Sequence, residues 1–217
     1  MSPKWIIGID EVGRGPLAGP ITVAAVAVLL KKPILKSDFS RFREVELPGK
    51  LAGIRDSKKL TPRKREVWDT IIRKNFLHTI SSVQPKSIDT RGISVAAHLA
   101  VKRCLQKLPK AYGLKPKACS VLLDGGLHAP ARYANQKTII KGDELHPIIA
   151  AASIVAKVHR DRYMLRLHKK LPQYGFDRHK GYGTKAHMAA IREHGLSEHH
   201  RVSFCRGIKV NKLLGGS

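Results

Sequence analysis

Trp5-Ile-Ile-Gly-Ile-Asp-Glu-Val-Gly-Arg-Gly15 is the stretch that decides the fold, together with the apolar run Ile21–Leu30 that follows it. Residues 5–9 are apolar and mostly β-branched, which predicts a short buried strand. The glycines and prolines between 13 and 20 predict a turn or loop. Two apolar runs on either side of a turn predict a hairpin, with an acidic pair just beyond its first strand.

Beyond this hairpin, strands are interleaved with helices. We expect a surface loop over 31–60, strands at 77–83, 119–123 and 137–140, and helices from Pro62 onward, over 86–108, 147–171 and 184–195. Such alternation indicates an α/β fold. A length of 217 residues suits one domain, and we expect 1–217 to form it, with a C-terminal helical extension from about residue 184.

The charge balance points to a polyanionic partner. Lys and Arg number 41 against 16 Asp and Glu, for a net charge of +25. Such an excess favours nucleic acid, although a basic packing protein without chemistry would show it too. No run approaches the roughly 20 apolar residues of a membrane span, and no signal peptide is recognisable at the start. The three distant cysteines exclude a disulfide framework, so we expect a cytoplasmic protein.

Four carboxylates, those of Asp10, Glu11, Asp124 and Asp143, each follow a predicted strand. Ligand sites in α/β sheets lie beyond the carboxyl ends of the strands, where loops gather side chains from several strands. Converging carboxylates repel one another unless a cation lies between them, and oxygen ligands suit Mg²⁺ or Mn²⁺. Each acid taken alone fits better as a turn cap or as a partner of the many basic residues, but four of them at strand ends favour the cation site.

Two further groups of residues suit phosphate or sugar. Gly13-Arg14-Gly15 would let a nucleic-acid backbone approach the main chain, or it would simply form a tight turn. On the helix over 147–171, Ser153 and Lys157 share one face and could bind a phosphate. Asp161, four residues further on, is expected to be a salt-bridge partner. The eleven histidines show no zinc spacing, and we expect most of them on the surface.

Eight motifs follow one another in a family order from about residue 5 to 205. They are Gly8-Ile-Asp-Glu-Val-Gly-Arg-Gly-Pro-Leu-Ala-Gly-Pro20, Asp56-Ser-Lys-Lys-Leu60, Asp124-Gly125, Lys141-Gly-Asp143, Ala150-Ala-Ala-Ser-Ile-Val-Ala-Lys-Val158, Arg160-Asp161, Lys180-Gly-Tyr-Gly-Thr184 and His200-Arg-Val-Ser-Phe204. This series resembles bacterial ribonuclease HII. The resemblance implies a ribonuclease H-like fold, in which helices flank a central five-stranded mixed sheet and a small helical part lies at the C-terminus.

The resemblance also assigns roles to residues. It implies that Asp10, Glu11, Asp124 and Asp143 bind the catalytic divalent metal, that Gly13, Arg14 and Gly15 read the ribose 2′-hydroxyl, and that Tyr182 stacks beside the sugar at the RNA-to-DNA junction. By the same resemblance, Ser57, Lys58, Ser153 and Lys157 belong to phosphate-contacting segments. A packing role in the turn after Lys180 is the alternative for Tyr182.

The implied activity is an endonuclease of RNA–DNA hybrids that also nicks 5′ of single ribonucleotides in duplex DNA, leaving 3′-hydroxyl and 5′-phosphate ends. Such an enzyme would serve ribonucleotide excision repair and DNA replication, and we expect a monomer. Val12 is commoner in the related ribonuclease HIII, whose extra N-terminal domain has no room here, so type HII is expected. The alternative is a non-catalytic duplex-binding protein with a degenerate nuclease fold.

Overall fold

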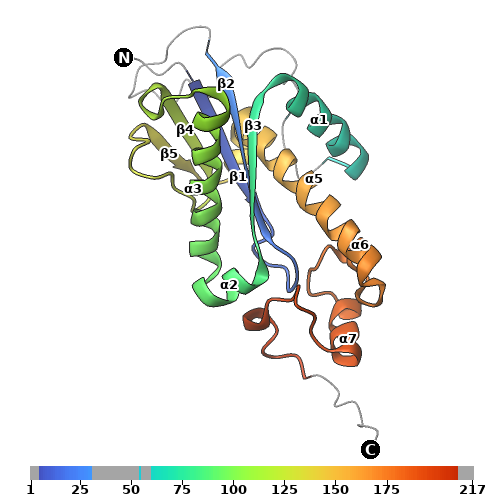
Figure 1. The fold of residues 1–217 in the computed structure, drawn as a ribbon. Coiled ribbons are helices and arrows are strands. Elements are labelled where there is room, and N and C mark those ends of the chain that lie inside the picture. Colours follow the sequence, from blue (N-terminus) through green and yellow to red (C-terminus); the bar gives the residue numbers. More distant parts are fainter. Residues whose placement is uncertain (1–4, 31–53, 55–59, 210–217) are drawn as a thin grey trace, which may run out of the picture.

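A computed structural model describes residues 5–30, 54 and 60–209. Within them lies a five-stranded mixed sheet of strand order β3-β2-β1-β4-β5 (Figure 1). β1 pairs antiparallel with β2, which pairs antiparallel with β3, whereas β4 runs parallel to β1 and to β5. The strands are β1 (Trp5–Val12), β2 (Ile21–Leu29), β3 (Leu77–Val83), β4 (Cys119–Asp124) and β5 (Gln136–Ile139).

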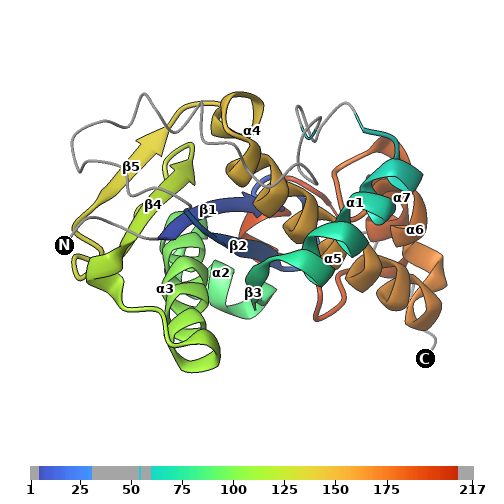
Figure 2. The same cartoon turned by 90° about the horizontal axis from the view of Figure 1, so that it is seen from above.

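Helices cover both faces of the sheet and extend past one end of it. They are α1 (Pro62–Asn75), α2 (Pro85–Arg91), α3 (Ile93–Tyr112), α4 (Gly142–Leu145), α5 (Pro147–Lys170), α6 (Phe176–His179) and α7 (Lys185–His194), with 3₁₀ turns η4 (Pro116–Ala118), η5 (Pro172–Tyr174) and η6 (Val202–Phe204). In Figure 2, α3 lies on one side of the sheet and α1 and α5 lie on the other. Figure 1 shows α6 and α7 beyond the end at which β1 finishes.

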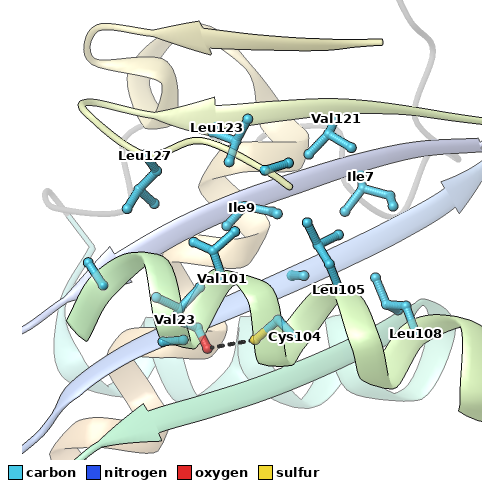
Figure 3. Packing of buried hydrophobic residues seen from close by; sticks show 14 of the residues in the cluster. Ile7, Ile9, Val23, Val101, Cys104, Leu105, Leu108, Val121, Leu123 and Leu127 are labelled. Carbon is cyan, nitrogen blue, oxygen red and sulfur yellow. Dashed lines mark hydrogen bonds between the residues drawn. The ribbon is translucent and has the colours of Figure 1, made fainter. Parts of the chain in front are cut away.

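The central strands are buried on both faces, and their side chains alternate between two cores. Ile7 and Ile9 pack toward α3, where the Cys104 thiol donates a hydrogen bond to the Val23 carbonyl at 3.4 Å (Figure 3). Ile6 packs toward α5 on the opposite face. Gly8 faces α5 so closely that a Cβ there would lie 2.2 Å from the Ile148 carbonyl oxygen. α5 therefore rests directly on β1.

The predicted hairpin, the α/β class and the five-stranded mixed sheet are confirmed. The Ala150–Ala152 stretch is buried against the sheet, as close packing requires. All three cysteines are buried and free, so the exclusion of a disulfide framework holds. No helix among the described residues is long and apolar enough to span a membrane. The loop predicted over 31–60 lies outside the described residues, apart from Ile54 and Leu60.

Some expectations were wrong in detail. The helix predicted over 86–108 is two helices, because Gly92 adopts φ +80° and separates α2 from α3. Asp10 and Glu11 belong to β1, which continues to Val12, and Asp143 lies on α4 rather than at a strand end. The expectation of surface histidines also fails: His146, His187 and His200 are buried, and only His128 and His194 are exposed. Aromatic and polar neighbours in the C-terminal elements accommodate His187 and His200.

Candidate active site

A pocket of about 440 Å³ opens where β1 and β4 end. It brings together nine of the predicted site residues and adds two that were not predicted, Val12 and Arg65. The predicted ones are Asp10, Glu11, Gly13, Arg14, Gly15, Asp124, Ser153, Lys157 and Tyr182. The β1–β4 pairing and the seating of α5 on β1 thus assemble side chains from three distant parts of the sequence.

Asp10 and Asp124 form the acidic centre of this pocket. Asp10 is buried, and burial raises the pKa of its carboxyl well above the ordinary value, helped by the charge of Asp124. A hydrogen bond with Ser153 opposes that rise. Asp124 Oδ1 accepts the Gly142 amide hydrogen bond at 2.6 Å. Because these carboxylates oppose each other's ionisation, the pocket favours a bound cation.

Glu11 contributes a third carboxylate from the same strand. Burial raises its pKa, while the hydrogen bond from Arg14 opposes the rise. The Arg14 Nε–H donates to Glu11 Oε1 at 2.5 Å. The other oxygen, Oε2, is buried and has no hydrogen-bond partner within the described residues. A buried carboxylate oxygen left in this way is a ready ligand for a hard cation.

Asp143 does not line the pocket. It is buried in the first turn of α4, next to Gly142, whose amide binds Asp124. Among the described residues, no three His, Cys, Asp or Glu side chains stand in a ready-made metal-holding group. The structure therefore brings three of the four predicted carboxylates to the pocket and places the fourth beside it.

We call the segment from Gly13 to Pro20 the rim, because its first three residues, Gly13, Arg14 and Gly15, line the pocket. Gly13 has φ +93°, and a Cβ there would lie 2.4 Å from Arg160 Nε, so only glycine fits. Gly15, by contrast, has open space on its Cβ side. The main chain at Gly15 is thus accessible from the pocket, as contact with a sugar or phosphate requires.

Tyr182 lines the same pocket and is half-exposed, next to Gly181, whose carbonyl accepts the Leu17 and Ala18 amides. Its carbonyl accepts a hydrogen bond from His187 Nδ1 at 2.9 Å. His187 Nε2 lies 3.1 Å from His200 Nε2, and His200 Nδ1 lies 3.0 Å from the Ser197 amide. Since the carbonyl only accepts, His187 carries its proton on Nδ1, His200 donates from Nε2, and the Ser197 amide donates to His200.

This chain of hydrogen bonds is satisfied only when both histidines are neutral. Protonating His187 would place two N–H groups against each other across the 3.1 Å contact with His200. Protonating His200 would place its Nδ1–H against the Ser197 amide N–H at 3.0 Å. Burial lowers the pKa of each histidine to about 4, in agreement with the neutral state. The backbone of Tyr182 is therefore attached to a buried, uncharged network.

Of the four residues predicted to contact phosphates, two line the pocket and two lie outside the described residues. Ser153 and Lys157 line the pocket, and Lys157 Nζ donates to Asp161 Oδ1 at 2.9 Å, which confirms Asp161 as a salt-bridge partner. Ser57 and Lys58 lie outside the described residues. Arg65 was not predicted from the sequence. It reaches the pocket from α1, and its guanidinium group donates a hydrogen bond to the Leu60 carbonyl at 2.5 Å. The basic run Arg63-Lys-Arg65 at the start of that helix was the available signal.

A family model described as ribonuclease HII matches residues 7–207. The chain belongs to the ribonuclease HII family. Relatives named ribonuclease HII include a protein of Caldicellulosiruptor bescii, 41% identical over 94% of this chain and 88% of its own length. Another, from Ralstonia nicotianae, is 43% identical over 99% of this chain and 81% of its own length. Membership of the ribonuclease HII family makes the chain a ribonuclease H enzyme of the H2 endonuclease type.

Solved structures agree in fold. Ribonuclease H2 of Pyrococcus horikoshii has a TM-score of 0.66 at 26% identity, covering 94% of this chain and 97% of its own. Ribonuclease HII of Archaeoglobus fulgidus, solved in a complex with PCNA, has a TM-score of 0.65 at 27% identity, covering 93% and 94%. A ribonuclease HIII solved with Mn²⁺, named Bst-RNase HIII, has a TM-score of 0.67 at 22% identity, covering 94% of this chain and 68% of its own, and shows the fold alone. The expected ribonuclease H-like fold is confirmed.

Proposed function

We propose that this chain cleaves the RNA strand of RNA–DNA hybrids and nicks duplex DNA on the 5′ side of a single embedded ribonucleotide. The observation that carries the proposal is the shared pocket. In it, three carboxylates lie beside the accessible main chain at Gly13–Gly15, three basic side chains and the aromatic ring of Tyr182. Acidic groups for hydrolysis and contacts for a sugar-phosphate backbone thus occupy one cavity.

The donor set fits a divalent cation. Asp10, Glu11 and Asp124 would hold it through oxygen atoms. Glu11 Oε2, which has no hydrogen-bond partner in the described part of the chain, gives a direct place for it. The assignment of Asp143 as the fourth ligand rests on the family resemblance and on its place beside Gly142. Such a set suits Mg²⁺ or Mn²⁺. When bound, a pair of these ions would supply an activated water nucleophile and stabilise the leaving 3′-oxygen.

The chain's own residues bind and orient the substrate. The main chain at Gly13–Gly15 would contact the 2′-hydroxyl, which distinguishes RNA from DNA at a given position. The ring of Tyr182 would pack against the sugar, and Lys157, Ser153 and Arg65 would contact phosphates from the other side of the pocket. Ser57 and Lys58 are proposed to add phosphate contacts. Catalysis then depends chiefly on placing the scissile phosphate beside the carboxylates.

Three further expectations belong to this proposal. The catalytic domain comprises residues 1–217 with its helical extension from about 184, the protein acts as a monomer, and it works in the cytoplasm in ribonucleotide excision repair and DNA replication. Light scattering of the purified protein, alone and with a short duplex, tests the monomer. A mass of twice the chain would contradict it.

The activity is tested with an end-labelled DNA duplex that holds one ribonucleotide, next to an all-DNA duplex of the same sequence. Each is incubated with Mg²⁺, with Mn²⁺ and with a chelator. We expect one cut, only in the ribonucleotide-bearing strand and only with metal. Equal cutting of both duplexes would refute reading of the 2′-hydroxyl. Tight binding without any cutting would instead support the non-catalytic duplex-binding protein.

A further inference from the structure

Two fully buried arginines lie beneath the rim of the pocket and have no described ion-pair partner. Arg160 is on α5 and Arg201 follows α7, and both have an exposed fraction of 0%. Burial lowers the pKa of both guanidinium groups, that of Arg201 to about 9 with a contribution from Arg160. Arginine side chains nevertheless stay protonated in proteins. Burying two like charges is costly, which calls for a reason beyond packing.

Both guanidinium groups donate hydrogen bonds to backbone carbonyls of the rim, and Arg160 also donates to one carbonyl of the turn before Tyr182. Arg201 donates to the carbonyls of Gly13 (2.6 Å), Arg14 (2.8 Å) and Gly19 (3.0 Å). Arg160 donates to those of Pro20 (3.0 Å), Ala18 (3.1 Å) and Lys180 (3.0 Å). A planar fork can reach three carbonyls at once, which a lysine ammonium cannot do in this arrangement.

The direction of these bonds determines which way the rim presents its amides. In a trans peptide the C=O and the following N–H point in opposite directions. Because the Gly13 and Arg14 carbonyls point inward to Arg201, the N–H groups of Arg14 and Gly15 point away from it. No hydrogen bond found in the described part of the chain uses either amide. Both residues line the pocket, so their amides are available to a substrate oxygen there.

Arg160 links the turn that carries Tyr182 to the rim. It binds the carbonyl of Lys180, two residues before Tyr182, and its guanidinium carbon lies 6.0 Å from the centre of the Tyr182 ring. The Gly181 carbonyl also accepts the amides of Leu17 (2.8 Å) and Ala18 (3.2 Å). The rim and the Tyr182 turn are thus held to one another through buried contacts.

We propose that Arg160 and Arg201 are positioning residues for ribonucleotide specificity. They hold the Arg14 and Gly15 amides and the Tyr182 ring in the one arrangement that recognises a 2′-hydroxyl. This inference rests on the proposed function, because it names the residues that set the recognition geometry. A purely structural role would instead predict loss of stability, with any remaining folded protein discriminating normally.

The test uses Arg201→Lys, which keeps the charge and loses the fork. Affinity for the single-ribonucleotide duplex and for its all-DNA counterpart is measured in chelator, and single-turnover cleavage in Mg²⁺. We expect the single-turnover rate of cleavage at the ribonucleotide to fall at least tenfold. The ratio of affinities for the ribonucleotide duplex and the all-DNA duplex should fall toward one. Affinity for the all-DNA duplex should stay within about twofold of wild type.

Two controls separate this effect from general damage. Arg162→Lys makes the same change on α5 at a residue that pairs with Asp69 and Glu66 outside the pocket, and it should change neither quantity. Leu108→Ala, in the core on the far face of the sheet, should lower the Tm while leaving the preference of the folded protein intact. An Arg201→Lys variant that keeps the wild-type preference, or loses affinity for both duplexes equally, would overturn the inference.

Should Arg201→Lys fail to fold, Arg160→Lys provides the second variant with the same expected loss. Wild-type NMR provides a measurement that needs no variant. The Arg14 and Gly15 amide resonances should shift with the ribonucleotide duplex and much less with the all-DNA duplex; equal shifts would overturn the inference. A wild-type protein with no preference would overturn the proposed function and this inference together, whereas preference retained in both arginine variants would overturn the inference alone.

Discussion

At the scale of single residues, the folded chain disfavours the charged form of the Asp10 carboxyl. Asp10 is buried close to two other carboxylates, and burial together with their charge raises its pKa. We expect Asp10→Asn or Asp124→Asn to abolish cleavage, because an amide keeps the shape and removes the charge that binds a cation. Cleavage assays in Mg²⁺ check this, and wild-type rates in either variant would refute the assignment.

The same substitutions should not weaken the fold. Removing one of several mutually repelling carboxylates should leave the metal-free Tm unchanged or higher. Duplex binding in chelator should persist, because the basic contacts are retained. A loss of Tm together with loss of cleavage would instead indicate that these side chains hold the structure.

Tyr182 allows a sharper test of substrate reading. Its ring is half-exposed at the pocket, while its backbone is held by His187. Tyr182→Ala should lose a stacking contact of roughly 1–3 kcal/mol and, by misplacing the phosphate, up to about a hundredfold in turnover on a single ribonucleotide. Binding of all-DNA duplex should change little.

Tyr182→Phe is the matched control, since it keeps the ring and should retain most activity. If the residue only packs the turn after Lys180, the alanine variant would lower the Tm and weaken binding to every duplex in parallel. Measuring Tm, all-DNA binding and single-ribonucleotide cleavage on the same two variants separates these outcomes.

At the scale of secondary-structure elements, the C-terminal histidines predict a pH-dependent stability. The folded-state pKa values of His187 and His200 are about 4, below the ordinary 6.5, so the unfolded chain binds more protons between these values. The stability gained from neutral histidines is complete above about pH 6.5 and is lost as the pH falls toward 4. For one histidine the loss is on the order of 3 kcal/mol.

The measurement is the Tm of wild type and of His187→Gln from pH 7 to pH 4.5. The variant should lose less Tm on acidification than the wild type, whereas His194→Gln, at an exposed position, should follow the wild type. Parallel curves for all three proteins would show that the buried pair does not titrate in this way.

The sequence predicted most of the elements because their signals are local. The hairpin, the start of α1 at Pro62 and the long helix α5 each follow from adjacent residues. The break at Gly92 was missed because the apolar spacing continues across it. The short α4 carrying Asp143 was missed for another reason: its position depends on Gly142 docking onto Asp124.

The site was predictable to the extent that its residues are carboxylates or glycines in recognisable motifs. Its supports were not. Arg201 contacts the Arg14 carbonyl across 187 positions of sequence, and no local pattern marks such a contact. The neutral His187–His200 pair likewise depends on tertiary burial, which is why these histidines were expected on the surface.

At the scale of the whole molecule, a net charge of +25 should dominate duplex affinity. Binding releases counterions, with a slope of about −0.9 in log K against log salt for each phosphate contact. We expect affinity for any duplex to fall steeply between 50 and 200 mM salt, by roughly a thousandfold for six contacts. Titrations at several salt concentrations check this, and a flat dependence would point to a small acidic ligand instead.

The central claim is that the chain cuts the phosphodiester on the 5′ side of a nucleotide recognised by its 2′-hydroxyl, and that Asp10, Glu11 and Asp124 would hold the divalent cation this hydrolysis needs. The most direct measurement maps both ends of the product from a duplex with one ribonucleotide, cut in Mg²⁺. The account predicts an upstream strand ending in a DNA 3′-hydroxyl and a downstream strand beginning with the ribonucleotide and a 5′-phosphate. A cut on the 3′ side, leaving a 2′,3′-cyclic phosphate on the ribonucleotide, would make the 2′-hydroxyl the nucleophile and contradict it.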